Sequence, residues 1–201
     1  MPEDFVSVTD LEIFLGVTEG SLTPELASLA VNAAQATVRN YLQQEITYNS
    51  ETIRLDGTGK SLLRLPQRPV REVASVTESG TSLTVVDDYL RDRSFLVRVD
   101  CFWVKGVRNV EVQYGHGWDV SDLSDSQSDY IPVPADIILA TLSAARRFYQ
   151  QQGTTSTGSV ISEKMGDYSY RLSDEAQQAA GNDLITAEKA VLDWYKVGGA
   201  G

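Results

Sequence analysis

The stretch 132–152, PVPADIILATLSAARRFYQQQ, constrains the fold most because its apolar residues recur at helical spacing. Ile138, Leu142 and Tyr149 fall on one stripe, as the buried face of an amphipathic helix requires. Pro134 suits the first helical position, where its missing N–H leaves no hydrogen bond unmade. We therefore predict a central helix from Pro134 to the end of this stretch, with one long helix before it and another after it.

The helix before it is predicted over residues 23–44. Thr23 is a favourable N-cap and Pro24 a favourable first residue. The apolar positions that follow have helical spacing and predict one buried face: Leu26, Leu29, Ala30, Ala33, Ala34, Thr37, Val38, Tyr41 and Leu42.

Two more helices are predicted near the ends of the chain. Residues 183–196 carry a narrow apolar stripe, and Asn182 is the expected cap of that helix. Thr9 and Glu12 have the spacing of a capping box, which predicts a short helix that ends at Gly16.

Residues 47–119 show a different pattern, with short runs rich in Val, Ile, Thr and aromatic residues between Gly, Asp and Ser. The glycines in 56–60 predict a hairpin turn between two strands, and 78–81 predicts a second turn. We expect about five or six antiparallel strands, because no connection has room for the crossover helix that parallel strands need.

These patterns predict an α+β fold. The expected architecture is an antiparallel helical bundle of three main helices plus a short N-terminal helix, with an inserted antiparallel β-rich module. The expected division is residues 1–46 for the N-terminal helices, 47–119 for the β module, and 120–201 for the central and C-terminal helices that complete the bundle.

Composition limits the classes of function. The net charge is −11, which argues against tight phosphate binding, because that affinity comes from Lys and Arg displacing counterions. It is compatible with DNA that passes without sticking. No apolar run approaches the roughly 18 residues needed to span a bilayer. The N-terminus lacks the apolar segment of a signal peptide, so no membrane association is expected.

A search for reactive groups gives no catalytic, metal-binding or cofactor-binding residue. His116 is the only histidine and is interpreted as a turn residue after a strand. Cys101 has apolar and acidic neighbours and is expected to be a buried structural residue. The Gly-Lys-Ser at 59–61 lacks the earlier glycine and the following helix of a phosphate loop. The acidic residues at 122–129 lack the glycine and closing Glu of a calcium loop.

Several motifs, taken together and in order, resemble the head–tail connector (adaptor) family of tailed bacteriophages. The resemblance covers about residues 9–196. The sequences that carry it are DLEIFLG at 10–16, VRNYL at 38–42, LDG at 55–57, LPQRPV at 65–70, VEVQYGHGW at 110–118, VPADI at 133–137, SEKMGDYSY at 162–170 and LITAEKA at 184–190.

The resemblance implies a structural protein of the virion rather than an enzyme. Such proteins dock on the portal protein as a ring, expected to be a dodecamer, and are often monomers in isolation. They extend the DNA channel and receive a tail-side completion or head-closure protein. The implied location is the head–tail interface of the virion, and the host cytoplasm during assembly. DNA would pass through transiently without specific binding.

Seven residues are the candidate partner interface, because Tyr and Trp are enriched at hot spots and the GDYS loop is the most distinctive part of the resemblance. They are Glu163, Asp167, Tyr168, Tyr170, Trp194, Tyr195 and Lys196.

Two alternatives stay open at this stage. One is a head-closure or tail-completion protein of the virion, a class that is mostly β. The other is an enzyme or small-ligand module with its site near His116 and Asp119.

Overall fold

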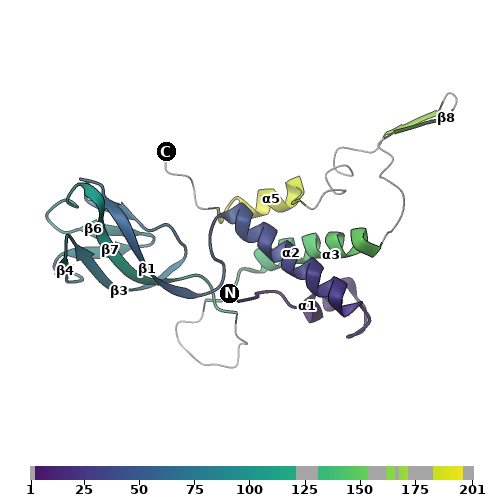
Figure 1. Cartoon of the computed structure of the whole chain (residues 1–201), viewed down its shortest axis with the longest axis horizontal. Helices are drawn as coiled ribbons and strands as arrows, with labels where there is room; N and C mark the ends of the chain where they lie inside the picture. The colour runs from purple at the N-terminus through teal and green to yellow at the C-terminus, as the bar shows by residue number, and fades with distance from the viewer. Residues whose placement is uncertain (1–2, 121–130, 154–161, 166–167, 172–182, 197–201) are drawn as a thin grey trace. The chain divides into compact units, whose positions relative to one another are not determined.

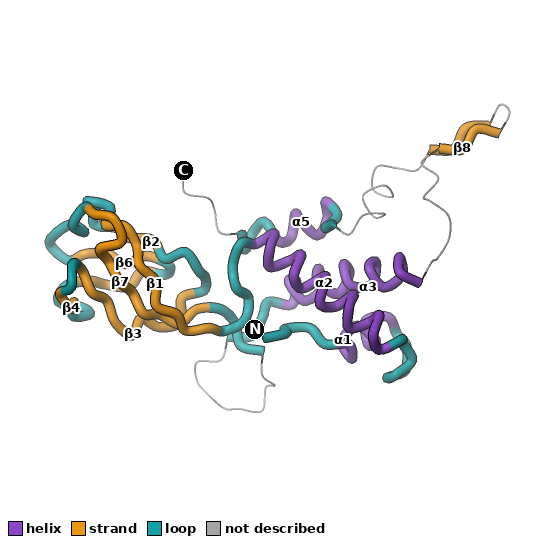
Figure 2. Tube along the Cα trace, viewed as in Figure 1, coloured by secondary structure: helices purple, strands orange, loops and turns teal. Residues whose placement is uncertain are grey.

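The structure is a computed structural model, and two compact units account for its chain. The residues that it describes are 3–120, 131–153, 162–165, 168–171 and 183–196. The β unit contains Gln44–Pro132, and the helical unit contains Asp4–Gln43 and Val133–Lys196. Figure 2 shows the strands between residues 49 and 116 (orange) in the β unit, and the helices (purple) in the helical unit.

The helical unit is built on two long helices, α2 (Pro24–Leu42) and α3 (Ala135–Gly153), which pack along each other. The shorter α1 (Val8–Leu15) contacts both, and α5 (Thr186–Leu192) contacts α3 (Figure 1). Its core includes Leu11, Ala30, Ala34, Val38, Ile137, Ala144, Phe148 and Leu192.

The first helix starts earlier than the sequence pattern indicated. Ser7 is the N-cap of α1; its hydroxyl accepts from the Asp10 N–H at 3.1 Å, and the Asp10 carboxylate accepts from the Ser7 N–H at 2.8 Å. The capping box predicted at Thr9 and Glu12 is therefore wrong. Glu12 is buried and instead accepts hydrogen bonds from backbone N–H groups of the loop after α1.

The helix α2 opens at Thr23 and Pro24 as predicted, but its buried face is rotated. Leu29 is 54% exposed, whereas Gln35 is fully buried and its Oε1 accepts from the Phe5 N–H at 2.8 Å. The N-terminal segment thus covers part of this face, beside the packing of α2 on α3. The buried residues of α2 are Ala27, Ala30, Val31, Ala34, Gln35, Val38 and Leu42.

The β unit contains two antiparallel sheets. The four-stranded sheet has the order β1 (Asn49–Gly57), β7 (Gly106–His116), β3 (Val70–Glu78), β4 (Thr81–Leu83). The three-stranded sheet has the order β2 (Leu62–Arg64), β6 (Phe95–Arg98), β5 (Tyr89–Asp92). All the ladders between these named strands are antiparallel, as expected.

One of the two predicted hairpins is confirmed and the other is wrong. β3 and β4 form a hairpin in which Val76 lies opposite Leu83. β1 does not pair with β2, because β1 lies beside β7 and β2 beside β6. Gly57 is nevertheless required where β1 ends, since a Cβ there would lie 1.8 Å from the Val104 carbonyl oxygen.

Both sheets contribute to one hydrophobic cluster, as in packed sheets whose inner faces interdigitate. Trp103 and Tyr114 are its largest fully buried members. The buried residues of this cluster are Leu63, Leu65, Val76, Tyr89, Leu96, Trp103, Val110, Val112 and Tyr114.

The fold is α+β, but the predicted bundle of three main helices is wrong. The described residues contain four helices, of which only α2 and α3 are long. The third expected helix, 183–196, is reduced to the seven residues of α5. Its N-cap is Ile185, whose N–H donates to Glu188, and the expected cap Asn182 lies outside the described residues. Beyond Leu192 the chain turns through i→i−3 backbone hydrogen bonds.

Within the residues that the structure describes, no helix combines the length and the apolar composition needed to cross a bilayer.

Candidate interaction surfaces

The connection between β6 and β7, residues 99–105 and here called the tip loop, is anchored by a buried tryptophan. Trp103 is fully buried; its Nε1–H donates to the Leu96 carbonyl at 3.3 Å, and its backbone N–H donates to the Lys60 carbonyl at 3.0 Å. The indole therefore ties the loop to β6, and the Trp103 backbone ties it to the turn after β1.

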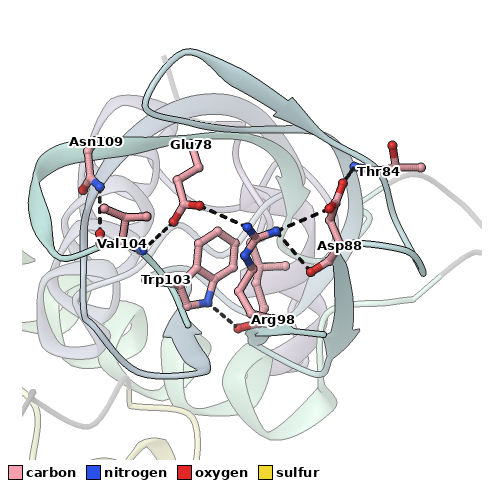
Figure 3. Close-up of polar contacts among 8 residues, drawn as sticks. Glu78, Thr84, Asp88, Arg98, Trp103, Val104 and Asn109 are labelled. Atoms are coloured by element: carbon pink, nitrogen blue, oxygen red, sulfur yellow. Dashed lines mark hydrogen bonds and ion pairs between the residues drawn. The ribbon is translucent and has the colours of Figure 1, made fainter. Parts of the chain in front are cut away.

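A buried ion pair holds the tip loop from its other side (Figure 3). Glu78 accepts from the Val104 N–H at 2.7 Å and from Arg98 Nη2 at 3.2 Å. The Arg98 guanidinium lies 5.3 Å from the Trp103 ring centroid, and its Nη1 donates to the Asp88 carbonyl at 3.2 Å. Both charges are thus compensated and hydrogen-bonded, which a buried pair needs in order to be stable.

Next to the anchored Trp103, several apolar side chains are exposed to solvent. Phe102 and Val104, on either side of the buried Trp103, are 68% and 55% exposed, and Val107 is 83% exposed. Lys105 beside them is exposed as well. Rigid aromatic and aliphatic side chains of this kind lose little entropy on binding, so the loop has the properties of a protein-binding surface.

The alternation of outward, inward and outward side chains in Phe102, Trp103 and Val104 is the sequence signal for this surface, and it is not among the predicted interface residues. The prediction that Cys101 is buried is wrong: Cys101 is exposed, and the tip loop turns at the preceding Asp100, where φ is +55°.

Three of the predicted interface residues form the turn after α5. Trp194 is 90% exposed. Tyr195 is half-buried, and its hydroxyl donates to the two Asp136 carboxylate oxygens at 2.7 and 2.9 Å; burial and these bonds raise the pKa of Tyr195 to about 12. Lys196 Nζ lies 4.4 Å from the Tyr41 ring centroid. Tyr195 and Lys196 therefore fix the turn from which Trp194 projects.

An apolar groove of about 220 Å³ runs between α3 and α5, one turn from Trp194. Its wall includes Leu139 and Val191, both exposed. The carboxylate Glu188 is buried in the same wall, where its Oε2 accepts from Arg147 Nη2 at 2.5 Å. Its other lining residues are Asp136, Ala140, Ser143, Ile185 and Ala187.

The remaining predicted interface residues belong to a separate hairpin. β8 (Ser162–Met165) pairs antiparallel with β9 (Tyr168–Arg171), with Glu163 opposite Tyr170 and Met165 opposite Tyr168. Asp167 lies outside the described residues. The role of these seven residues in binding a partner stays a prediction.

His116, the histidine considered for chemistry, is buried at the end of β7. Its Nε2 lies 3.2 Å from Glu51 Oε1, and that oxygen also accepts from the Tyr114 hydroxyl at 3.0 Å. Asp119 pairs with Arg71 at 2.8 Å. Among the residues that are described, no group of three or more His, Cys, Asp or Glu side chains is arranged to hold a metal ion.

The burial of His116 predicts a pH-dependent stability. Desolvation lowers the pKa of His116 from its ordinary 6.5, although the nearby carboxylates of Glu51 and Glu45 oppose the shift. As the pH falls below 6.5 the unfolded chain takes up the proton first, so stability present at pH 7.5 is lost progressively down to the folded-state pKa. We expect the urea midpoint of the β unit to fall between pH 7.5 and 5.5.

Urea unfolding followed by circular dichroism across that pH range checks this expectation, with His116→Asn as the matched variant. The variant is less stable overall because a buried ring is removed, but its midpoint should change less with pH. Equal pH dependence in the two proteins would contradict the assignment to His116.

Comparison with solved structures finds chains that share this α+β fold. One similar chain belongs to the structure described as "Virion of native gene transfer agent (GTA) particle"; it is 14% identical, with a TM-score of 0.56. Another belongs to "Neck of empty GTA particle computed with C6 symmetry"; it is 13% identical, with a TM-score of 0.57. Each match covers 97% of this chain and 91% of the other, so the likeness of fold includes both units.

The family model described as "Protein of unknown function (DUF3199)" matches residues 80–187, more than half of the chain. The chain belongs to this family. A comparison with curated protein sequences found no match.

Proposed function

We propose that this chain is a structural subunit of the neck of a tailed-phage-like particle, and more specifically a head–tail connector. In this role, identical copies dock on the portal protein as a ring, extend the DNA channel and present a surface to a tail-side completion or head-closure protein. The same proposal includes three parts of the chain, residues 1–46, 47–119 and 120–201. It also includes a ring of twelve copies and a location at the head–tail interface.

The proposal rests on the share of both chains that the structural match covers. A chain from the neck of a gene transfer agent particle resembles this chain over 97% of its residues, and the match leaves only a small part of that other chain uncovered. A likeness limited to one common motif would cover the helices or the sheets alone. The match instead supports the same pairing of a helical unit with a β unit.

Two properties of the described surface support a role in assembly. Phe102 and Val104 of the tip loop and Val107 at the start of β7 are exposed to solvent, and so is Trp194 in the turn after α5. Exposed large apolar residues on rigid supports are typical of protein-binding sites. The net charge of −11 supports a channel that DNA traverses without adhering, because fixed negative charge repels phosphate.

The proposal predicts that purified protein adds to portal rings. Electron microscopy of portal rings, with and without the chain, should show extra density on one face of the portal when the chain is present. A variant with Phe102→Ser, Val107→Ser and Trp194→Ser tests whether the exposed apolar residues are needed, and Val85→Ser, at another exposed valine, is the control. Unchanged portal rings at saturating wild-type protein would contradict the connector role.

A further inference from the structure

The three-stranded sheet has one face that points away from the hydrophobic cluster of the β unit. Leu63 and Leu96 lie opposite each other in this sheet, and both are buried in the cluster. Because side chains alternate between the two faces of a strand, the residues on either side of them point the other way. Six residues form this second face, here called the outer sheet face: Leu62, Arg64, Leu90, Asp92, Phe95 and Val97.

The register arranges four of these side chains around an apolar row that crosses all three strands. The row runs from Leu62 on β2 through Val97 on β6 to Leu90 on β5. Leu62 is 50% exposed and Leu90 is 48% exposed. The half-buried side chains that pack against the hydrophobic cluster come from the four-stranded sheet, and Val97 and its neighbour Phe95 are not among them. Apolar residues grouped on an exposed face are typical of a binding surface.

The next row on the same face has opposite charges at its two ends. It runs from Arg64 on β2 through Phe95 on β6 to Asp92 on β5. Within the described part of the chain, neither Arg64 nor Asp92 takes part in an ion pair. Their backbones are about 10 Å apart, because neighbouring strands are separated by about 4.8 Å. The row therefore presents one cation and one anion on the two sides of Phe95.

We infer that the outer sheet face binds the same face of a second copy, about a two-fold axis that runs along β6. Such an axis places β6 over β6 and exchanges β2 with β5. Arg64 of each copy then faces Asp92 of the other, so the contact contains two ion pairs. Leu62 of each copy faces Leu90 of the other. The outward side chains of β6 lie near the axis and meet their own counterparts.

The occupant is a second copy because the charge pattern of this face is complementary to itself. A face with charges of one sign would repel its own copy and would fit a partner of the opposite sign. On the outer sheet face, the two-fold axis exchanges the cation with the anion, so both are paired at once. This is the arrangement of an isologous interface, in which residue i contacts residue j and j contacts i.

The charges that flank the face are compatible with the same axis. Lys60, just before β2, faces the segment just before β5 in the second copy, which contains Asp87 and Asp88. Arg93, in the turn after β5, lies opposite the uncharged residues 65–67 that follow β2. The flanking segments therefore add one attraction on each side of the axis and place no like charges directly opposite each other.

The contact has the dimensions of ordinary sheet packing, with faces about 10 Å apart and strand directions nearly aligned. Three short strands give a small interface, so we expect a weak pair with a dissociation constant on the order of 100 μM. A two-fold contact cannot join neighbours of one ring, because those are related by rotation about the ring axis. The inference therefore concerns the free protein and does not rest on the proposed function.

Charge reversal tests the contact and its symmetry. Sedimentation velocity of the full chain, from about 10 to 500 μM, measures the dimer; a reducing agent is present because Cys101 is exposed. Arg64→Asp places two anions opposite each other, and Asp92→Arg places two cations opposite each other. We expect each variant alone to dimerise at least about tenfold more weakly than the wild type. An equimolar mixture of the two variants regains opposite charges in mixed pairs and should dimerise about as well as the wild type.

Arg108→Asp is the matched control, because it reverses an exposed charge on β7 of the other sheet. It should leave dimerisation unchanged. Recovery in the mixture also shows that both single variants are folded, and far-ultraviolet circular dichroism checks this independently. A wild-type chain that stays monomeric up to about 500 μM would overturn the inference. Dimers that neither reversal weakens, or a mixture that dimerises no better than its components, would overturn it as well.

Discussion

Replacement of Trp103 by alanine is expected to lower the free energy of unfolding of the β unit by about 3–5 kcal/mol. The indole is fully buried in a cluster to which both sheets contribute, and its removal leaves a cavity that the surrounding strands fill only in part. The change also removes the Nε1–H hydrogen bond to Leu96 and the ring beneath the Arg98 guanidinium. Urea unfolding followed by far-ultraviolet circular dichroism measures the loss.

The neighbouring residue supplies the control. Phe102→Ala removes an aromatic ring of similar size from a side chain that is 68% exposed, so we expect a change within about 0.5 kcal/mol. Comparable losses for the two variants would contradict the assignment of Trp103 as anchor and Phe102 as a free surface residue. The pair also separates folding from binding, because only Phe102→Ala should weaken partner binding while preserving the fold.

Replacement of Arg147 by methionine is expected to destabilise the helical unit by about 3–5 kcal/mol. Glu188 is 4% exposed and its Oε2 accepts from Arg147, while its Oε1 has no hydrogen-bond partner among the described residues. Without the guanidinium, a buried carboxylate would remain unpaired. Since Glu188 also caps the start of α5 through the Ile185 N–H, the loss should loosen α5 from α3. Thermal and urea unfolding measure the effect.

A more exposed ion pair, between Lys189 of α5 and Asp183 just before it, is the matched control. Lys189 Nζ lies 2.9 Å from Asp183 Oδ2, but the side chains are 35% and 72% exposed. Lys189→Met should therefore change the free energy of unfolding by about 1 kcal/mol or less. The double variant Arg147→Met/Glu188→Leu should recover much of the loss, because both charges are then removed together. If Arg147→Met were as mild as Lys189→Met, the buried pair would have no structural role.

The positions of the main helices could be predicted from short sequence signals. The face that a helix buries depends instead on residues far away in the chain. Thr23 and Pro24 mark the start of α2 through their own backbone preferences. The buried side of α2 packs on α3 and includes Gln35, which binds the backbone of Phe5 thirty residues away. Because α2 is rich in alanine and leucine all round, its own sequence favours no single face strongly, and Leu29 was wrongly placed inside.

The strand pairing shows the same limit. Residues 56–60 carry a genuine turn signal, but a turn does not specify which strands it joins. Ile53 pairs with Val112 in β7, and Leu63 pairs with Leu96 in β6, so both partners lie beyond the reach of a local pattern. The hairpin of β3 and β4 was predictable because its partners are adjacent in the chain.

The candidate surfaces were predictable in part. Trp194 is predicted as an interface residue from its residue type, and the structure shows it exposed on a turn fixed by Tyr195, while its role in binding stays a prediction. The tip loop was missed, because Phe102 and Val104 resemble interior strand residues until Trp103 between them is seen to fill the core.

A reconstruction of the neck of the particle that contains this protein tests the central claim most directly. The account predicts a ring of identical copies between the portal and the tail, with density that fits the helical unit and the β unit of every copy. A reconstruction that places the chain elsewhere in the particle, or a purified particle that lacks the chain altogether, would contradict it.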